Sequence, residues 1–262
     1  MRIGLIGVGT IGTFLLDKIN LEKRIPNYEI TAIFDEREKA KTSLKDVEKK
    51  YNVQLYQDIE AFLQSSVDLV VECANIPVVQ KYGEQILQQK DFFIISIGAL
   101  VDDNFVQTLK QIGQQAGTKI YLPSGAIGGL DVLQAASSLG GLDTVSLTTR
   151  KPANALTEEV IKEEKILFTG KAKDAIVAFP KNANVSIILS LAGIGVEQTE
   201  VTIIADPAVE KNLHYVEAKG DFGSLSLKLE NDPSPTNPKT SYLTALSIFS
   251  AIQKLNSTIH IT

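Results

Sequence analysis

The sequence has little sulfur and few of the residues that usually bind metals. Its 262 residues include one cysteine, one methionine, two histidines and no tryptophan. A single cysteine excludes an internal disulfide and is typical of a reducing compartment, so we expect a cytoplasmic protein. The cysteine and the histidines, Cys73, His214 and His260, lie far apart and in no ligand spacing, so no metal site is predicted. The chemistry therefore requires an organic cofactor or none.

Long hydrophobic runs and an excess of basic residues are also missing. The longest apolar run, residues 185–196, contains two serines and is too short to span a bilayer. The 26 lysines and arginines stand against 31 acidic residues, which gives a net charge of −5 without a dense basic run. We therefore expect neither a membrane nor a nucleic acid as partner. With 44% hydrophobic residues, the chain is long enough to bury a sizeable core.

The first 123 residues alternate short apolar runs with segments of helical periodicity. The apolar runs are nearly continuous, which is typical of a parallel sheet covered by helices on both faces. We therefore predict an α/β domain with a Rossmann-type, doubly wound parallel sheet over residues 1–123. The predicted strands are 2–7, 29–35, 53–56, 67–74, 92–98 and 119–123, and the predicted helices include 78–90 and 104–115.

From residue 124 the strand pattern changes. Apolar and polar residues alternate, as in a sheet with one open face, and this predicts an α+β domain over residues 124–234 that carries substrate binding and catalysis. Its predicted strands are 142–150, 201–205, 213–218 and 224–230, and its predicted helices are 130–138 and 185–191.

The last part of the chain is predicted to return to the first domain. The proline-rich stretch 231–238 is interpreted as a linker, and Asn237 and Pro238 as the cap and first residue of a final helix. Residues 235–262 would then complete the dinucleotide-binding domain. The side chains expected to be buried along this helix are Leu243, Leu246, Phe249, Ile252 and Leu255.

A glycine-rich G-x-G-x-x-G pattern follows the first predicted strand directly. The first glycine permits a tight turn, the second lets the backbone approach a pyrophosphate, and the third allows the helix to pack closely on the strand. The N-terminus of the helix offers free N–H groups and a favourable dipole to the phosphates. The expected cofactor contacts in this loop are Gly7, Gly9, Thr10, Ile11 and Gly12.

The second predicted strand ends at Asp35, about 20 residues beyond the glycines, where an acidic residue binds the adenosine ribose. Its carboxylate favours NAD, because it repels a 2′-phosphate. Arg37 lies two residues further on and could hold such a phosphate. We therefore predict NAD as the cofactor, with NADP tolerated.

Small residues follow three more strands at the same sheet edge, in segments 72–75, 96–99 and 124–129. The carboxyl ends of parallel strands line the ligand crevice in such sheets, so these residues, Ala74 among them, leave room for the nicotinamide half of a dinucleotide. Ordinary turns between strand and helix would have the same composition. Cys73 is interpreted as a small buried residue rather than a nucleophile, because no histidine is near it in sequence.

The second half contains residues suited to catalysis, and each also has a structural interpretation. His214 titrates near neutrality and could exchange the proton that accompanies hydride transfer, or it could be a structural histidine of the sheet. Asn184 could bind the nicotinamide amide or cap the following helix. Lys151 and Lys239 are suited to bind substrate carboxylates, although most exposed lysines are only solvated.

Together these motifs resemble the L-aspartate dehydrogenase family in its archaeal and bacterial form, nearly from end to end. The resemblance implies that His214 is the catalytic histidine and that Ala126 and Asn184 contact the cofactor. The matching segments, in order, are 7–12, 71–74, 96–99, 123–131, 150–152, 179–185, 206–207, 212–214, 220–223 and 237–241.

The resemblance implies an oxidoreductase that acts on the CH–NH2 group of L-aspartate with NAD or NADP. The product, iminoaspartate, hydrolyses to oxaloacetate and ammonia or feeds quinolinate synthesis on the way to NAD. Two alternatives remain: a related two-domain enzyme similar to homoserine dehydrogenase, and a dinucleotide-binding sensor without turnover. The presence of His214 argues against a sensor, because binding alone needs no proton acceptor. We expect L-aspartate as the small-molecule partner and a homo-oligomer, namely a dimer.

Overall fold

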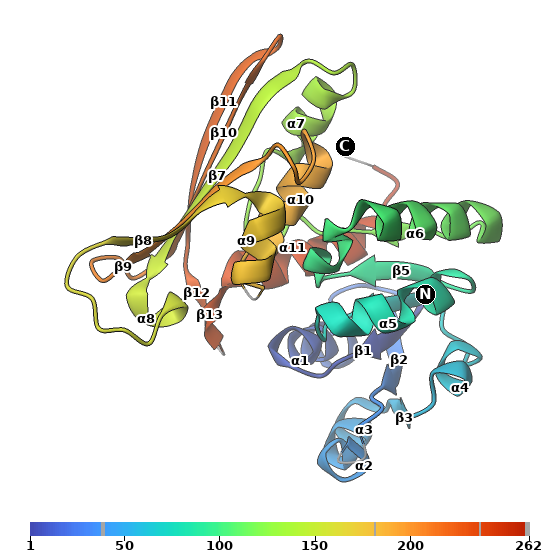
Figure 1. The fold of residues 1–262 in the computed structure, drawn as a ribbon. Helices are drawn as coiled ribbons and strands as arrows, with labels where there is room; N and C mark the ends of the chain where they lie inside the picture. Colours follow the sequence, from blue (N-terminus) through green and yellow to red (C-terminus); the bar gives the residue numbers. More distant parts are fainter. Residues whose placement is uncertain (38–39, 181, 236, 260–262) are drawn as a thin grey trace. The chain divides into compact units, whose positions relative to one another are not determined.

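The computed structural model describes residues 1–37, 40–180, 182–235 and 237–259, except for the side chains at 40, 41, 238 and 239. The chain divides into two compact units, residues 1–123 and 124–262, and each unit forms its own main sheet (Figure 1).

The first unit contains a six-stranded parallel sheet, in the order β3-β2-β1-β4-β5-β6. This confirms the predicted Rossmann-type fold, and every strand predicted in this half is present, with ends that differ by a few residues. All four residues of β4 are buried, as expected for a central parallel strand. The strands are β1 (Arg2–Ile6), β2 (Glu29–Phe34), β3 (Gln54–Tyr56), β4 (Leu69–Glu72), β5 (Asp91–Ile94) and β6 (Ile120–Tyr121).

Helices connect these strands, and several begin and end at clear local signals. The Asn75 side chain accepts a hydrogen bond from the Val78 N–H at the start of α5, and Asp102 caps α6 in the same way. Helix α6 ends at Gly117, whose φ of 71° is left-handed. The helices are α1 (Thr10–Leu16), which continues as a π-helical turn (Asp17–Leu21), α2 (Ala40–Ser43), α3 (Lys45–Tyr51), α4 (Ile59–Leu63), α5 (Ile76–Leu87) and α6 (Asp103–Ala116), with a 3-10 helix at Ile97–Val101.

The strand order reverses between β1 and β4. From β1 the chain proceeds outward to β2 and β3, and it then returns to β4 on the other side of β1. In open α/β sheets, ligands bind at the carboxyl ends of the strands on either side of such a reversal. The turns that follow β1 and β4 are therefore the expected walls of a ligand crevice.

The second unit contains a five-stranded mixed sheet in the order β11-β10-β7-β9-β8. Helices α7, α9 and α10 lie along one face of this sheet (Figure 1). The strands are β7 (Leu142–Pro152), β8 (Lys165–Lys171), β9 (Glu200–Asp206), β10 (Asn212–Gly220) and β11 (Gly223–Asn231), and the helices are α7 (Leu130–Ser137), α8 (Ala153–Leu156), α9 (Ala172–Ala178) and α10 (Asn184–Ala192). Strand β8 and helix α9 are not evident from the sequence. Strand β8 lies at the sheet edge, where its Ile166 is 63% exposed, so no apolar pattern marks it.

The interpretation of residues 231–238 as a linker is wrong. Strands β12 (Pro233–Ser234) and β13 (Asn237–Ser241) pair in a small antiparallel sheet, and the final helix α11 (Tyr242–Lys254) begins only after Ser241. Strand pairing therefore overrides the local Asn-Pro signal for a helix start.

The buried side of helix α11 also differs from the prediction. Of the predicted residues Ile252 is buried, together with Ala245 and Ile248, whereas Leu246 is 40% exposed. The return of this helix to the first domain stays a prediction.

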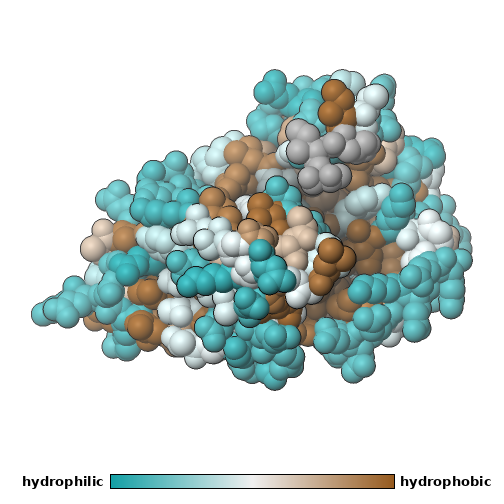
Figure 2. Space-filling view, turned by 90° about the horizontal axis from the view of Figure 1, so that it is seen from above, coloured by the Kyte–Doolittle hydropathy of each residue, from teal (hydrophilic) through white to brown (hydrophobic). Residues whose placement is uncertain are grey.

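In the ranges that the structure describes, no helix is both long and apolar enough to cross a membrane. Several large apolar side chains are nevertheless exposed, among them Leu139, Val160 and Val177. Figure 2 shows one face of the molecule on which hydrophobic side chains lie among hydrophilic ones. The homodimer stays a prediction.

Candidate active site

The turn after β1 has the three glycine environments that a dinucleotide-binding turn requires. Gly7 has a φ of +92°, and a Cβ there would come within 2.9 Å of the Cys73 carbonyl oxygen in the turn after β4. A Cβ at Gly9 would meet no atom within 4 Å, so this glycine faces open space that a pyrophosphate can enter. A Cβ at Gly12 would lie 2.3 Å from the Gly7 carbonyl oxygen, so only glycine lets α1 pack this closely on the turn. Thr10 and Ile11 form the first turn of that helix.

Asp35 follows β2 at the same edge of the sheet and is only 8% exposed. Its carboxylate accepts hydrogen bonds from Arg37, whose Nε lies 2.8 Å from Oδ1 and whose Nη2 contacts Oδ2. Burial alone would raise the pKa of the Asp35 carboxyl, but the hydrogen bonds and charge of Arg37 outweigh burial and hold it below its ordinary value. The Arg37 side chain is 74% exposed, so it can turn away without leaving a packed site.

Glu72, the last residue of β4, joins the turns that follow β4 and β5. Its side chain is fully buried and accepts hydrogen bonds from the backbone N–H groups of Ala74 and Ser96 and from the Ser96 hydroxyl. The sequence interpretation gave this residue no role. The signal that could have found it is an acidic residue at the end of a strand that is otherwise apolar.

The loop at 124–129 is attached to the sheet of the second unit. Asn231 at the end of β11 donates from Nδ2 to the Ala126 carbonyl oxygen over 2.8 Å. Asn231 pairs with Asn212, two residues from His214, so Ala126 and His214 belong to the same end of this sheet. Asn184 is the first residue of α10, and the cap position is held by Ala183. Asn184 is therefore not at the cap position of this helix, and its contact with the cofactor stays a prediction.

Strands β7 and β10 place a polar cluster on the face of the sheet that the helices cover. Thr149 and His214 are opposite each other in the antiparallel pair, and 3.0 Å separates Thr149 Oγ1 from His214 Nδ1. Lys151 lies two residues after Thr149 and therefore on the same face. Its Nζ donates to Asn182 Oδ1 over 3.0 Å. Lys239 lies in β13, and its side chain is outside the described part of the structure.

Lys151 is a buried cation without a counter-ion. It is 6% exposed, and no carboxylate of the described residues lies within ion-pair distance of its ammonium group. Burial lowers the pKa of Lys151 to about 8. An unpaired charge in such an environment costs folding free energy, so its presence indicates a functional role.

His214 is the most strongly perturbed group of the cluster. It is 2% exposed, and burial together with the nearby positive charge of Lys151 lowers the pKa of His214 to about 3. The expectation that this histidine titrates near neutrality therefore does not hold for the free protein. At neutral pH the imidazole carries no charge, so it can act as a proton acceptor but not as an acid.

Arg150 precedes Lys151 and points to the opposite face of the sheet, as neighbours in a strand do. Its Nη1 lies 2.7 Å from Asp206 Oδ2 and 2.5 Å from Glu164 Oε2. Because these carboxylates neutralise Arg150, Lys151 is the cation of this strand that is left for an anionic ligand.

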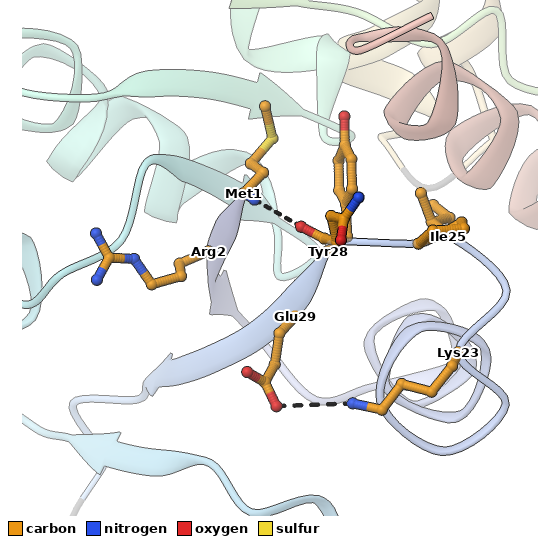
Figure 3. A pocket seen from close by; sticks show the side chains of 8 residues that line it. Met1, Arg2, Lys23, Ile25, Tyr28 and Glu29 are labelled. Carbon is orange, nitrogen blue, oxygen red and sulfur yellow. Dashed lines mark hydrogen bonds and ion pairs between the residues drawn. The ribbon is translucent and has the colours of Figure 1, made fainter.

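A separate pocket of about 340 Å³ lies at the opposite, amino end of β1 and β2 (Figure 3). Three of its charged groups bond within the pocket: the Met1 ammonium donates to the Asn27 carbonyl oxygen over 2.7 Å, and Lys23 and Glu29 form an ion pair at 3.6 Å. The guanidinium of Arg2 pairs with Asp68, outside the pocket. The Tyr28 side chain points away from that ion pair (Figure 3). This pocket is remote from the glycine-rich turn and is not part of the candidate site.

Two protein-family models match the chain, one for each unit. The model described as the NAD-binding domain of homoserine dehydrogenase matches residues 7–123, and the model described as the C-terminal domain of aspartate dehydrogenase matches residues 131–255.

Full-length relatives carry the same description. The L-aspartate dehydrogenase of Methanosarcina barkeri is 40% identical, with 100% of this chain and 99% of the relative covered. That of Methanococcoides burtonii is 39% identical, with 97% of each chain covered. The crystal structure of aspartate dehydrogenase from Thermotoga maritima superimposes with a TM-score of 0.81 at 31% identity and covers 100% of this chain and 99% of that one.

Proposed function

The chain belongs to the L-aspartate dehydrogenase family, and we propose that it oxidises L-aspartate at the carbon that bears the amino group, with NAD as the preferred cofactor and NADP tolerated. The observation that carries this proposal is a pair of groups on one sheet face. One is the buried cation Lys151, which has no counter-ion among the described residues, and the other is the neutral imidazole of His214. An anionic amino acid that must lose a proton before it is oxidised fits both groups.

The first unit fits a pyridine nucleotide, which accepts a hydride from the substrate when it is bound. The open space at Gly9 and the N-terminus of α1 would hold the pyrophosphate. The Asp35 carboxylate would bind the ribose hydroxyls in place of Arg37. With NADP, the released Arg37 guanidinium would face the 2′-phosphate. Ala74, Ala126 and Asn184 are the proposed contacts of the nicotinamide end.

Lys151 would bind a substrate carboxylate. In the part of the chain that the structure describes, its ammonium has one neutral partner, Asn182, and no carboxylate, so a substrate carboxylate would supply a counter-ion. Charge-assisted hydrogen bonds of this kind contribute about 1.5–3 kcal/mol. Aspartate has two carboxylates, and Lys239 remains the proposed partner of the second.

His214 would accept the proton of the substrate ammonium. If Nδ1–H donates to Thr149 Oγ1, the lone pair of Nε2 faces away from the sheet contact and is available to the substrate. A deprotonated amine can then release hydride from the α-carbon. The resulting imidazolium can assist the addition of water to the imine, so one side chain serves both steps.

A spectrophotometric assay of NADH formation with aspartate, homoserine and glutamate tests the proposal. We expect turnover with aspartate and little with the other two, because homoserine lacks the second carboxylate and glutamate is longer by one methylene. Homoserine is included because the family model of the first unit has that description. Preferred oxidation of homoserine, or NAD binding with no turnover of any of the three, would overturn the proposal.

Two wider expectations stay predictions within this proposal: that the enzyme works in the cytoplasm and that it forms a dimer. Among the described residues, the exposed apolar side chains Leu139, Val160 and Val177 are available to a partner subunit. A measurement of molecular mass in solution tests the dimer directly.

A further inference from the structure

Glu72 carries a buried carboxylate that the proposed reaction does not use. Both of its oxygens accept hydrogen bonds from backbone N–H groups. Oε1 accepts from Ala74 over 2.6 Å, and Oε2 accepts from Ser96 over 2.9 Å and from Ile95 over 3.2 Å. The Ser96 hydroxyl adds a fourth bond, to Oε1, over 2.8 Å.

This pattern of donors favours the charged form of the side chain. Three backbone N–H groups can only donate, and together they occupy both carboxylate oxygens. A proton on either oxygen would compete with one of these donors. Burial raises the pKa of Glu72, and the hydrogen bonds from Ser96, Ala74 and Ile95 oppose that rise. In the described part of the chain, no cation lies within ion-pair distance of the carboxylate, so its charge is uncompensated.

Glu72 lies beside the part of the crevice that is proposed to bind the nicotinamide. The residue lies at the strand-order reversal, and the turn that it holds through Ala74 is the turn against which Gly7 packs. Its hydrogen bond with Ser96 also fixes the turn after β5. Strand β5 neighbours β4 on the side away from β2, whose end carries Asp35, the proposed contact of the adenosine ribose. These two turns line the half of the crevice that we assign to the nicotinamide.

We propose that Glu72 is a positioning residue for the nicotinamide end of the cofactor and that its negative charge makes the site bind the oxidised cofactor in preference to the reduced one. The inference rests on the proposed cofactor site. The oxidised nicotinamide ring carries a positive charge, and the reduced ring carries none. A fixed anion in a buried environment therefore stabilises the first form and leaves the second nearly unaffected.

The discriminating variant is Glu72→Gln, which keeps the size and one acceptor oxygen but removes the charge. The measured quantity is the ratio of the dissociation constants of NAD+ and NADH, obtained by NADH fluorescence and by competition with NAD+, without aspartate. We expect the preference for NAD+ over NADH to fall by about tenfold, since one buried negative charge is lost.

Ser96→Ala is the matched control, because it removes one of the four hydrogen bonds and keeps the charge. A loosened turn should weaken both cofactor forms by the same factor, so the ratio stays that of the wild type. Glu72→Asp is a second variant that retains the charge at a shorter reach. It should weaken both forms and preserve the ratio. Glu72→Ala also removes the charge and should move the ratio in the same direction as Glu72→Gln, which keeps the inference testable if Glu72→Gln does not fold.

Equal changes of both affinities in Glu72→Gln would show that Glu72 only supports the fold. A ratio that moves toward NADH in Glu72→Asp, which keeps the charge, would show that the charge of Glu72 does not set the ratio. A wild-type protein that binds neither NAD+ nor NADH would overturn this inference together with the proposed cofactor site. A wild-type protein that binds both and does not oxidise aspartate would overturn the proposed function alone, and the measured ratio would still decide the role of Glu72.

Discussion

Replacement of Lys151 by methionine should raise the KM for aspartate by roughly tenfold or more and stabilise the fold at neutral pH. Methionine has a similar length and no charge, so the variant keeps most of the packing and removes the buried ammonium. Lys151 has no carboxylate partner among the described residues, and the uncharged Asn182 is its one hydrogen-bond partner there. The cation therefore lowers the stability of the free protein, while its expected benefit appears only when a substrate carboxylate binds.

The magnitude follows from the pKa of Lys151, which burial lowers from 10.5 to about 8. A shift of this size corresponds to about 3 kcal/mol of folding free energy at pH 7, because one pKa unit is worth about 1.36 kcal/mol. Loss of the hydrogen bond to Asn182 offsets about 1 kcal/mol of this gain. The expected net stabilisation at pH 7 is therefore about 2 kcal/mol.

The sign of the effect depends on pH. Below pH 8 the lysine is protonated in both folded and unfolded states, and the full destabilisation is present. As the pH rises from about 8 to 10.5, only the unfolded chain keeps the proton, so the wild type gains stability relative to the variant. The two proteins should change order within that range, at about pH 9.5. Above the range the variant should be less stable by about 1 kcal/mol because it lacks the hydrogen bond.

Urea unfolding of both proteins at pH 7 and at pH 10 measures this difference. Lys219→Met is the matched control, since Lys219 is an exposed lysine of the neighbouring strand β10 and its replacement should have little effect. The reasoning is refuted if Lys151→Met is less stable than the wild type at pH 7 and the difference does not change with pH. Full activity of the variant would remove Lys151 from the substrate site.

Three further predictions concern the proposed reaction. His214→Asn should lower turnover by about 10²–10⁴, the usual value of general acid–base catalysis, and leave NADH binding unchanged in a fluorescence titration; near-normal turnover would return His214 to a structural role. Asp35→Ala should weaken NAD more than NADP, because the lost carboxylate binds the ribose of one and repels the phosphate of the other, and equal losses in dissociation constant would contradict this. The KM for aspartate should rise above pH 8, up to about tenfold per pH unit, as Lys151 loses its proton, and a KM that stays flat to pH 10 would argue against that anchor.

The first unit was predicted well because its signals are local. Continuous apolar runs marked the parallel strands, and the glycines of residues 7–12 marked the turn, whose three conformational requirements the structure reproduces at Gly7, Gly9 and Gly12. The Asn75 cap of α5 is local in the same sense, because its partner is three residues away. Such features depend on backbone sterics within a few residues and are readable without an alignment.

The errors arose where distant segments decide the structure. Asn237 and Pro238 have the composition of a helix start, yet residues 233–234 pair with this segment and turn it into a strand. Strand β8 lacks the alternation of burial that marks β11, the other edge strand, and only its pairing with β9 identifies it as a strand. The role of Glu72 was missed for a related reason: its partners Ile95 and Ser96 lie 23 and 24 residues away in the chain, and only the order of β4 and β5 brings them together.

The charge states of Lys151 and His214 show the same limit and bear on the proposed role of these two residues. His214 and Lys151 are 63 residues apart, and their electrostatic coupling exists only because β10 pairs with β7. Burial is the larger cause of the low pKa of His214, and the positive charge of Lys151 lowers it further. A substrate carboxylate at Lys151 would cancel that charge and make the imidazole more basic at the moment when the ammonium group of the substrate arrives. A histidine that is a poor base in the free protein is thus consistent with the proposed role, because the substrate itself supplies the missing negative charge.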